Sequence, residues 1–250
     1  MNKTTIVVAT YPGDKWIPKL KKHFEKIGID NNSVIYKSPD EKKSFAENNN
    51  LGAKEVKTPY ILFLNNDTEI QEDAIKNMEA ILDSNKSVWI VGAKVYFLET
   101  VIKHVIFRGV VGHIHGVKDS IQCAGIQFTP EFKPYESGRG WKRSDPRVGK
   151  RQLMPGVTGA CMMIRADKFL ELGGFDEQFV NGWEDTDFCL RVLEEGGQIM
   201  YEPSAECGHY FGGSDQEGRF GYEDQNYNLW IAKWQYTGRV FRVLTYQAEP

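Results

Sequence analysis

The stretch Tyr60-Ile-Leu-Phe-Leu-Asn-Asn-Asp67 decides the fold, because an unbroken apolar run ends abruptly in three polar residues. A run without polar alternation is typical of a strand that is buried on both faces of a parallel sheet. Ligands of open α/β sheets bind beyond the carboxyl ends of the strands, where Asp67 can hold a divalent cation against a diphosphate. Asn-Asn-Asp-Thr is also good turn chemistry, and Asp67 or Thr68 can cap the following helix. The stretch alone leaves both interpretations open.

Strands and helices alternate on both sides of this stretch. The expected strands are 4–9, 33–36, 60–64 and 88–97. One helix is expected to start at Asp14 as its N-cap and to stop at Gly28, and a second amphipathic helix covers 74–82. This β-α-β order predicts an α/β protein with an open, mostly parallel central sheet flanked by helices.

Beyond residue 100 the pattern is less regular. The expected elements are a strand over 157–164 and helices over 167–172, 184–195 and 222–234. The segment 129–151 is rich in proline, glycine and basic residues, which predicts a long flexible loop. Its part Gly138–Arg147 fits either a lid that closes over a diphosphate or a merely solvated basic loop.

The bulk composition excludes several classes of protein. A net charge of −3 over 250 residues gives no reason to expect a nucleic-acid partner. The four cysteines form no C-x-x-C pair, so we expect reduced thiols and no zinc cluster. Eighteen apolar residues never run together, and no signal peptide follows the N-terminus. We therefore expect a cytoplasmic protein without a transmembrane segment, with peripheral membrane contact at most.

An acidic cluster, Glu184-Asp185-Thr186-Asp187, opens one of the expected helices. Three carboxylates in four residues repel one another, so a metal, a basic group or shared protons must neutralise some of them. Acidic residues are also favoured at helix N-termini by the helix dipole. One carboxylate could act as a general base, and the residues alone do not choose between these roles.

The late histidine, His209, is flanked by glycines that would let the backbone approach a phosphate closely. A lone histidine is more often a structural residue than a metal ligand. His104 has no assigned role, and the pair His113 and His115 is only a weak metal candidate.

Together these stretches resemble glycosyltransferase family 2, in particular its rhamnosyltransferase-like branch. The segments that carry the resemblance, in the family's own order, are 5–11, 44–52, 65–68, 159–165 with 173–177, 184–191, and His209. Asn65-Asn66-Asp67-Thr68 resembles the Asn-Pro-Asp-Thr form of the family's D-x-D signature, and 184–191 resembles its E-D-x-D-L-x-x-R motif. The match runs from Thr4 to Trp234, and so many motifs in order make it specific.

The resemblance implies a GT-A type, Rossmann-like nucleotide-binding fold, with one domain over 1–250. Residues 1–97 would form the nucleotide-sugar half, and 98–250 a smaller mixed acceptor and catalytic half. Asp67 would bind a divalent metal with His209 as second ligand, and this mixed oxygen and nitrogen set favours Mn²⁺ over Mg²⁺. Asp185 would be the catalytic base of an inverting single displacement, with Glu184 assisting acceptor binding.

The resemblance also implies the donor site. Thr10 and Tyr11 would line the nucleobase, Asn50 would lie near the base or phosphates, and Asn65 and Asn66 would join Asp67 on the donor loop. The implied partners are a nucleotide-sugar, with a UDP-sugar first and dTDP-rhamnose second, and a glycan, lipid-linked or protein acceptor. The chain departs from the family at 36–40, where relatives carry an aspartate that contacts the nucleobase. The residue that reads the base therefore stays open.

Two other functions fit parts of the sequence. A sugar-phosphate nucleotidyltransferase shares the donor chemistry, but it tends to carry a glycine-rich loop ending in Arg where this chain has Thr10-Tyr-Pro-Gly-Asp-Lys15. A relative that binds a nucleotide-sugar or a glycan without turnover is the non-enzymatic alternative. The presence of Asp67, Asp185 and His209 together argues against it.

Overall fold

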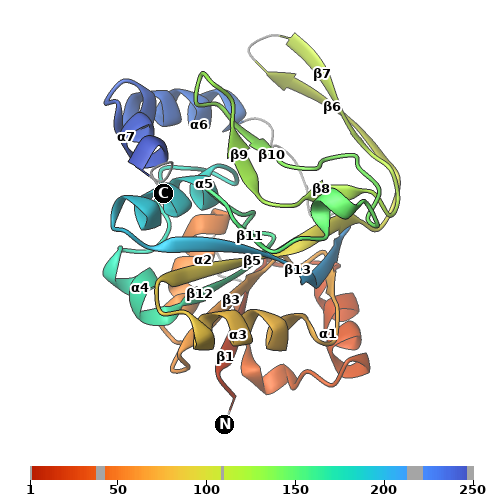
Figure 1. Cartoon of the computed structure of the whole chain (residues 1–250). Helices are drawn as coiled ribbons and strands as arrows, with labels where there is room; N and C mark the ends of the chain where they lie inside the picture. Colours follow the sequence, from red (N-terminus) through yellow and green to blue (C-terminus); the bar gives the residue numbers. More distant parts are fainter. Residues whose placement is uncertain (1, 38–42, 108–109, 213–221, 247–250) are drawn as a thin grey trace.

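The computed structural model describes residues 2–37, 43–107, 110–212 and 222–246, which form a mixed nine-stranded sheet flanked by helices, with two small two-stranded sheets beside it (Figure 1). The strands are β1 (Thr4–Ala9), β2 (Val34–Lys37), β3 (Tyr60–Leu64), β4 (Thr68–Ile70), β5 (Val88–Phe97), β6 (Val101–Phe107), β7 (Val110–Gly116), β8 (Ile121–Cys123), β9 (Ile126–Phe128), β10 (Pro134–Glu136), β11 (Gln152–Leu153), β12 (Cys161–Arg165) and β13 (Gln198–His209). The helices are α1 (Ile17–Lys26), α2 (Phe45–Ala53), α3 (Ala74–Ser84), α4 (Ala166–Glu171), α5 (Glu184–Glu194), α6 (Glu223–Trp230) and α7 (Arg239–Tyr246), and α6 continues into a π-helical turn over Ile231–Gln235.

The main sheet has the strand order β11-β13-β5-β12-β3-β1-β2, with β4 paired to β13 and β8 paired to β5. The α/β class predicted from the sequence is confirmed. Parallel pairing joins β3 to β1, β1 to β2, and β13 to β5. The strand β12 lies between β3 and β5 and runs antiparallel to both, and β4, β8 and β11 also pair antiparallel. The sheet is therefore mixed, where the sequence predicted a mostly parallel one.

The central strand β3 is buried along its whole length, as its apolar run predicts. Its side chains alternate between the two faces of the sheet. Leu62 and Leu64 belong to one core cluster, which includes apolar residues of α1 and α3. Ile61 and Phe63 belong to a second cluster, which includes residues of α2, α4 and α5. Because β3 is held from both faces, the loop that follows Leu64 starts from a fixed position.

Several local predictions differ from the structure. Trp16 is the N-cap of α1, so the assignment of that role to Asp14 was wrong, and Asp14 instead accepts a hydrogen bond from the Trp16 backbone at 2.9 Å. The helix α2 was not predicted, because three consecutive asparagines obscure it, although Ser44 and Glu47 form a capping box at its start. The strand predicted to begin at residue 157 begins at Cys161.

The segment 129–151 contains β10 and a short 3-10 turn at Pro146–Val148. Val148 is buried there and accepts a hydrogen bond from the Tyr201 hydroxyl through its backbone oxygen. The segment is thus packed against the body at this point, and its expected flexibility and closure stay predictions.

The hairpin β6–β7 extends away from the main sheet (Figure 1). His104 and His113 are register partners in this hairpin, but their side chains lie outside the described residues. His115 is on the same strand as His113 and is exposed. All four cysteines are buried and free. Within the part of the chain that the structure describes, no helix is long and apolar enough to cross a membrane.

Candidate active site

Asp67 and His209 meet at the edge of the sheet, although 142 residues separate them in the chain. The short strand β4 pairs with β13 so that Thr68 lies opposite His209, and this brings the loop after β3 beside the end of β13. The Asp67 Oδ1 atom lies 3.0 Å from His209 Nε2, and the side chains are 1% and 2% exposed. The Tyr210 backbone N–H also donates to the Asp67 carbonyl at 2.9 Å. The two residues that the resemblance implies as metal ligands are therefore in direct contact.

Two further side chains contact the imidazole of His209. Gln122, on β8, places its Oε1 atom 2.8 Å from His209 Nδ1. Asn65 places its Nδ2 atom 3.3 Å from His209 Nε2. Sequence reasoning missed Gln122, because no motif surrounds it and it lies 87 residues before His209. The glycine at 208 has a packing role, since a Cβ there would lie 2.5 Å from the Leu98 side chain.

The pair fits a divalent cation. A carboxylate oxygen and an imidazole nitrogen are both ligands of Mn²⁺, and a carboxylate suits Mg²⁺. Among the described residues, no group of three or more His, Cys, Asp and Glu side chains is arranged to hold a metal ion. A cation at Asp67 and His209 would thus take its remaining ligands from a bound diphosphate or water, which is common for cations that activate phosphates.

Residues at the end of β1 lie close to the same loop. Asn66 donates a hydrogen bond from Nδ2 to Asp14 Oδ2, which ties the turn after β1 to the turn after β3. Burial raises the pKa of the Asp14 carboxyl, and the hydrogen bonds from Asn66 and from the Trp16 backbone offset part of that rise. Burial also raises the pKa of the Tyr11 phenol, and the Asp14 and Asp67 carboxylates add to this. Asp14 therefore belongs to the site, where the sequence suggested only a helix cap.

Thr10 and Asn50, the other residues expected at the donor site, lie in different surroundings. Thr10 is buried at the end of β1, and its carbonyl accepts from Asn48 Nδ2 at 3.3 Å. The Asn50 side chain forms hydrogen bonds with the loop after α4. It donates to the Phe175 carbonyl and to Glu177, and it accepts from the Phe175 backbone N–H, each at 2.9 Å. Asn50 thus fastens α2 to the loop after α4, and the structure does not join it to the Asp67 loop. Ser38, Pro39 and Asp40 of the departing segment lie outside the described residues.

Asp185 is held in place by backbone N–H groups. Its Oδ2 atom accepts from the Gly159 N–H at 2.8 Å, and its Oδ1 atom accepts from the Thr186 N–H at 2.7 Å and from the Thr186 hydroxyl at 3.3 Å. A Cβ at residue 159 would lie 3.3 Å from the Asp185 Cβ, which is a tight contact, so glycine leaves room for this approach. The side chain is partly exposed, so a substrate hydroxyl can reach it.

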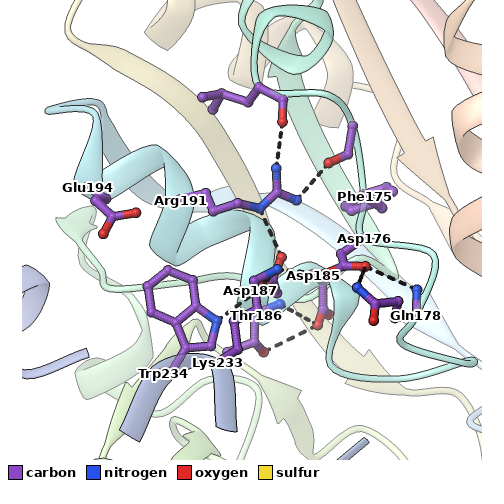
Figure 2. A network of polar contacts seen from close by, with 12 residues as sticks. Phe175, Asp176, Gln178, Asp185, Thr186, Asp187, Arg191, Glu194, Lys233 and Trp234 are labelled. Carbon is purple, nitrogen blue, oxygen red and sulfur yellow. Dashed lines mark hydrogen bonds and ion pairs between the residues drawn. The ribbon is translucent and has the colours of Figure 1, made fainter. Parts of the chain in front are cut away.

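Asp187 has the opposite surroundings, as Figure 2 shows. It is fully buried, and Arg191 Nε and Lys233 Nζ contact its carboxylate at 2.9 and 2.8 Å. The Trp234 indole N–H donates to it at 2.8 Å. The sequence left a metal, a basic group or shared protons as ways to neutralise the acidic cluster. For Asp187, basic groups neutralise the carboxylate.

The third carboxylate of the cluster, Glu184, is also buried. It accepts from the Gly182 backbone N–H at 2.6 Å. The residue before it, Trp183, has a left-handed backbone with φ of 75°, which is costly for a bulky side chain. The role of Glu184 in acceptor binding stays a prediction.

The arginines of 138–147 contact acidic side chains. Arg139 pairs with Glu136 and lies over the Phe211 ring, 5.2 Å from its centroid. Arg143 pairs with Glu206, and Arg147 pairs with Asp145 at 2.8 Å. The contacts of Arg143 with Glu206 and of Arg139 with Phe211 hold the segment against the body, whereas the other two pairs lie within the segment. Closure over a diphosphate stays a prediction.

Comparison with known proteins gives two family matches. The model described as glycosyl transferase family 2 matches residues 17–173, and the model described as the N-terminal domain of galactosyltransferase matches residues 143–213. The O-antigen biosynthesis protein RfbC of Myxococcus xanthus is 26% identical over 212 residues, which are 75% of this chain and 15% of RfbC. The rhamnosyltransferase WbbL of Escherichia coli is 25% identical over 181 residues, which are 66% of this chain and 60% of WbbL. The chain thus spans less than two thirds of either relative.

Among solved structures, the crystal structure of GalNAc-T7 with UDP, GalNAc and Mn²⁺ superposes with a TM-score of 0.56 and 12% identity. The match covers 83% of this chain and 43% of that one. At this level of identity, the likeness shows a shared fold.

Proposed function

The chain belongs to glycosyl transferase family 2 and has the GT-A fold, and from this premise we propose that it transfers a sugar from a nucleotide-sugar to an acceptor hydroxyl. The observation that carries the proposal is the dipeptide Gly159-Ala160. The Ala160 carbonyl accepts from the Asn65 backbone N–H at 3.0 Å, and the Gly159 N–H donates to Asp185 at 2.8 Å. Two neighbouring peptide groups thus hold the donor loop and the proposed base.

In the proposed reaction, Asp185 accepts the proton of the acceptor hydroxyl. The acceptor oxygen then bonds to the anomeric carbon, while the bond from that carbon to the diphosphate breaks and the nucleoside diphosphate leaves. A single carboxylate base suits a displacement with inversion, since no covalent intermediate on the protein is needed. The Gly159 and Thr186 N–H groups fix the carboxylate before the acceptor arrives. Glu184 is proposed to assist acceptor binding from the adjacent position.

Asp67 and His209 are proposed to hold a divalent cation, Mn²⁺ in preference to Mg²⁺. A cation bound there supplies Lewis-acid stabilisation of the charge that develops on the leaving diphosphate. Support comes from the direct contact of the two buried ligands and from the Mn²⁺ named with GalNAc-T7. Asn65, Asn66, Thr10 and Tyr11 are proposed to line the donor beside this pair.

We propose a UDP-sugar as the first candidate donor and dTDP-rhamnose as the second. The UDP named with GalNAc-T7 supports the first, and the description of WbbL as a rhamnosyltransferase supports the second. The acceptor is proposed to be a glycan, lipid-linked or protein hydroxyl. Nothing among the described contacts favours a nucleotidyltransferase over a glycosyltransferase.

Thermal unfolding with a panel of UDP-, GDP- and dTDP-sugars tests the donor and the metal together. A donor at about 100 times its Kd stabilises the folded chain by about 2.7 kcal/mol, which raises the Tm by roughly 5–10 °C. We expect this rise for a UDP-sugar or dTDP-rhamnose only when Mn²⁺ is present, and we expect Asp67→Ala to abolish it. The matched control is Asp73→Ala, because Asp73 is exposed and its side chain makes no capping hydrogen bond. A shift that survives Asp67→Ala, or a panel without any Mn²⁺-dependent shift, would contradict the proposal.

A further inference from the structure

The outer face of α1 carries a row of lysines. Lys19, Lys22 and Lys26 follow one another at intervals of three and four residues, which places them on one side of the helix. All three are exposed, whereas Leu20 and Phe24 are the buried residues of α1. The row is therefore on the side of the helix that faces away from the core.

The positive charge of this face is local. The segment 15–26 contains five lysines and one glutamate, in a chain whose net charge is −3. The three lysines of the row line an open hollow of about 530 Å³ together with His23, Glu25 and Glu69. Of these two carboxylates, Glu69 lies 4.0 Å from Lys19 Nζ, at the outer limit of an ion pair. The hollow thus keeps a positive surface.

An aromatic pair lies at the start of the row. The rings of Trp16 and Tyr210 have their centroids 4.9 Å apart, and both side chains are partly exposed. Lys19 Nζ lies 3.5 Å from the centroid of the Tyr210 ring and 5.1 Å from that of Trp16. Tyr210 also donates its backbone N–H to the Asp67 carbonyl at 2.9 Å. The basic row therefore begins beside the proposed donor site.

The arrangement fits a surface that carries many anionic groups. From Lys19 to Lys26 the row extends about 10 Å along the helix, so its ammonium groups can meet several phosphates at once. Lysine attracts an anion as a point charge without a fixed geometry, which suits mobile headgroups. Tryptophan and tyrosine have an apolar ring with a polar edge, which suits the boundary between lipid and water.

We propose that Lys19, Lys22 and Lys26 bind the chain to the anionic phospholipid headgroups of a membrane surface, with Trp16 and Tyr210 at the same contact. The contact itself needs neither donor nor metal. It rests on the proposed function only in its consequence, which is that a lipid-linked acceptor would meet the site at this surface.

Co-sedimentation with vesicles tests the binding. The vesicles consist of phosphatidylcholine alone or of phosphatidylcholine with phosphatidylglycerol, which is anionic. We expect the chain to bind only the anionic vesicles. This binding should weaken when the salt concentration rises from about 0.01 to about 0.1 M, because the screening length falls from about 30 to about 10 Å. A chain that binds neither kind of vesicle, or both equally, would overturn the proposal.

Variants test the row. Replacing its three lysines by glutamine should weaken binding to the anionic vesicles by about 10- to 100-fold, because each lysine near such a surface contributes roughly a factor of five. Replacing them by arginine keeps the charge and should leave the affinity close to that of the parent. The matched control removes the same charge from three exposed lysines outside the row, namely Lys54→Gln, Lys57→Gln and Lys86→Gln. Parent-like affinity in the glutamine triple, or an equal loss in the control triple, would overturn the role of the row.

A competition experiment separates a lipid headgroup from free phosphate. Inorganic phosphate should displace the chain from the anionic vesicles no better than sodium chloride at the same ionic strength. Stronger displacement by phosphate would assign the row to a phosphate ion and overturn the membrane contact. Since these measurements contain no donor, acceptor or Mn²⁺, their failure would leave the proposed transferase standing, and a failed transferase assay would leave the vesicle result standing.

Discussion

Asp185 and Asp187 lie two residues apart at the start of α5, yet their surroundings are opposite. Asp187 is fully buried, with Arg191, Lys233 and the Trp234 indole around its carboxylate (Figure 2). Asp185 is partly exposed and accepts hydrogen bonds from Gly159 and Thr186. Within the described residues, no cation pairs with Asp185.

The difference separates a buried, ion-paired carboxylate from one that is oriented by hydrogen bonds and partly exposed. A buried carboxylate between two cations cannot take a proton from a substrate without leaving those cations uncompensated. A carboxylate held by N–H donors at a partly exposed position is oriented and accessible. We propose that these two acidic residues of one motif have different roles, and the variants below test that division.

The largest effect is expected for Asp187→Ala. Removing one partner of a buried ion pair leaves uncompensated charge, which costs about 3–5 kcal/mol in the free energy of unfolding. For a chain of this size, the Tm should fall by roughly 6–20 °C in thermal unfolding. A fall of less than about 2 °C would mean that the network of Arg191 and Lys233 does not depend on Asp187.

A smaller effect is expected for Lys233→Met, because Asp187 keeps Arg191 and Trp234. Lys233 also contacts Asp176 at 2.6 Å. Burial pushes the pKa of Asp176 up, but the hydrogen bonds from Lys233 and the Gln178 backbone outweigh burial and leave this pKa below its ordinary value. We expect the free energy of unfolding to fall by about 1.5–3 kcal/mol at neutral pH, which is the range for hydrogen bonds to charged groups.

The same variant gives a pH test. A carboxyl with a lowered folded-state pKa contributes stability above its unfolded pKa of about 3.9 and loses it as the pH falls through the folded value. The difference in Tm between the parent and Lys233→Met should therefore shrink as the pH falls below about 4. A difference that stays constant or widens in acid would contradict the pairing of Lys233 with Asp176.

The smallest effect is expected for Thr186→Val. The Thr186 hydroxyl contacts Asp185 at 3.3 Å, while the stronger contact at 2.7 Å comes from the backbone N–H, which the variant keeps. Losing the hydroxyl should raise the activation free energy by about 0.5–1.5 kcal/mol, which would be measured as a severalfold fall in kcat. A fall of a hundredfold or more in kinetic measurements would show that the hydroxyl, and not the backbone, orients the base.

Most of the fold could be predicted from the sequence, because the patterns that indicate its strands and helices are local. The buried run Tyr60–Leu64 and the acidic start of α5 each determine their own element. The helix α2 was missed since its three asparagines have low helix propensity, and the capping box that starts it depends on only two residues. The antiparallel position of β12 depends on pairing with β3 and β5 across the sheet, which no local pattern reports.

The sequence predicted many residues of the candidate site, but it did not predict the contacts that those residues make. Arg191 stands four residues after Asp187 and could have been paired with it from helical spacing. Lys233 is distant in sequence, and so is Gln122 from His209, so neither contact has a local signature. Asp14 has the sequence position of a helix cap, but its Oδ2 atom accepts from Asn66 across the site.

The central claim, that Asp185 is the base and Asp187 is structural, is tested most directly by Asp185→Asn beside Asp187→Asn. Release of nucleoside diphosphate in the presence of acceptor and Mn²⁺ would be measured together with the Tm of each variant. We expect Asp185→Asn to stay within about 4 °C of the parent Tm and to bind donor, while its turnover falls by about 10²- to 10⁴-fold. Asp187→Asn should have a lower Tm than the parent and keep most of the turnover per folded molecule. An Asp185→Asn chain as active as the parent would contradict the account.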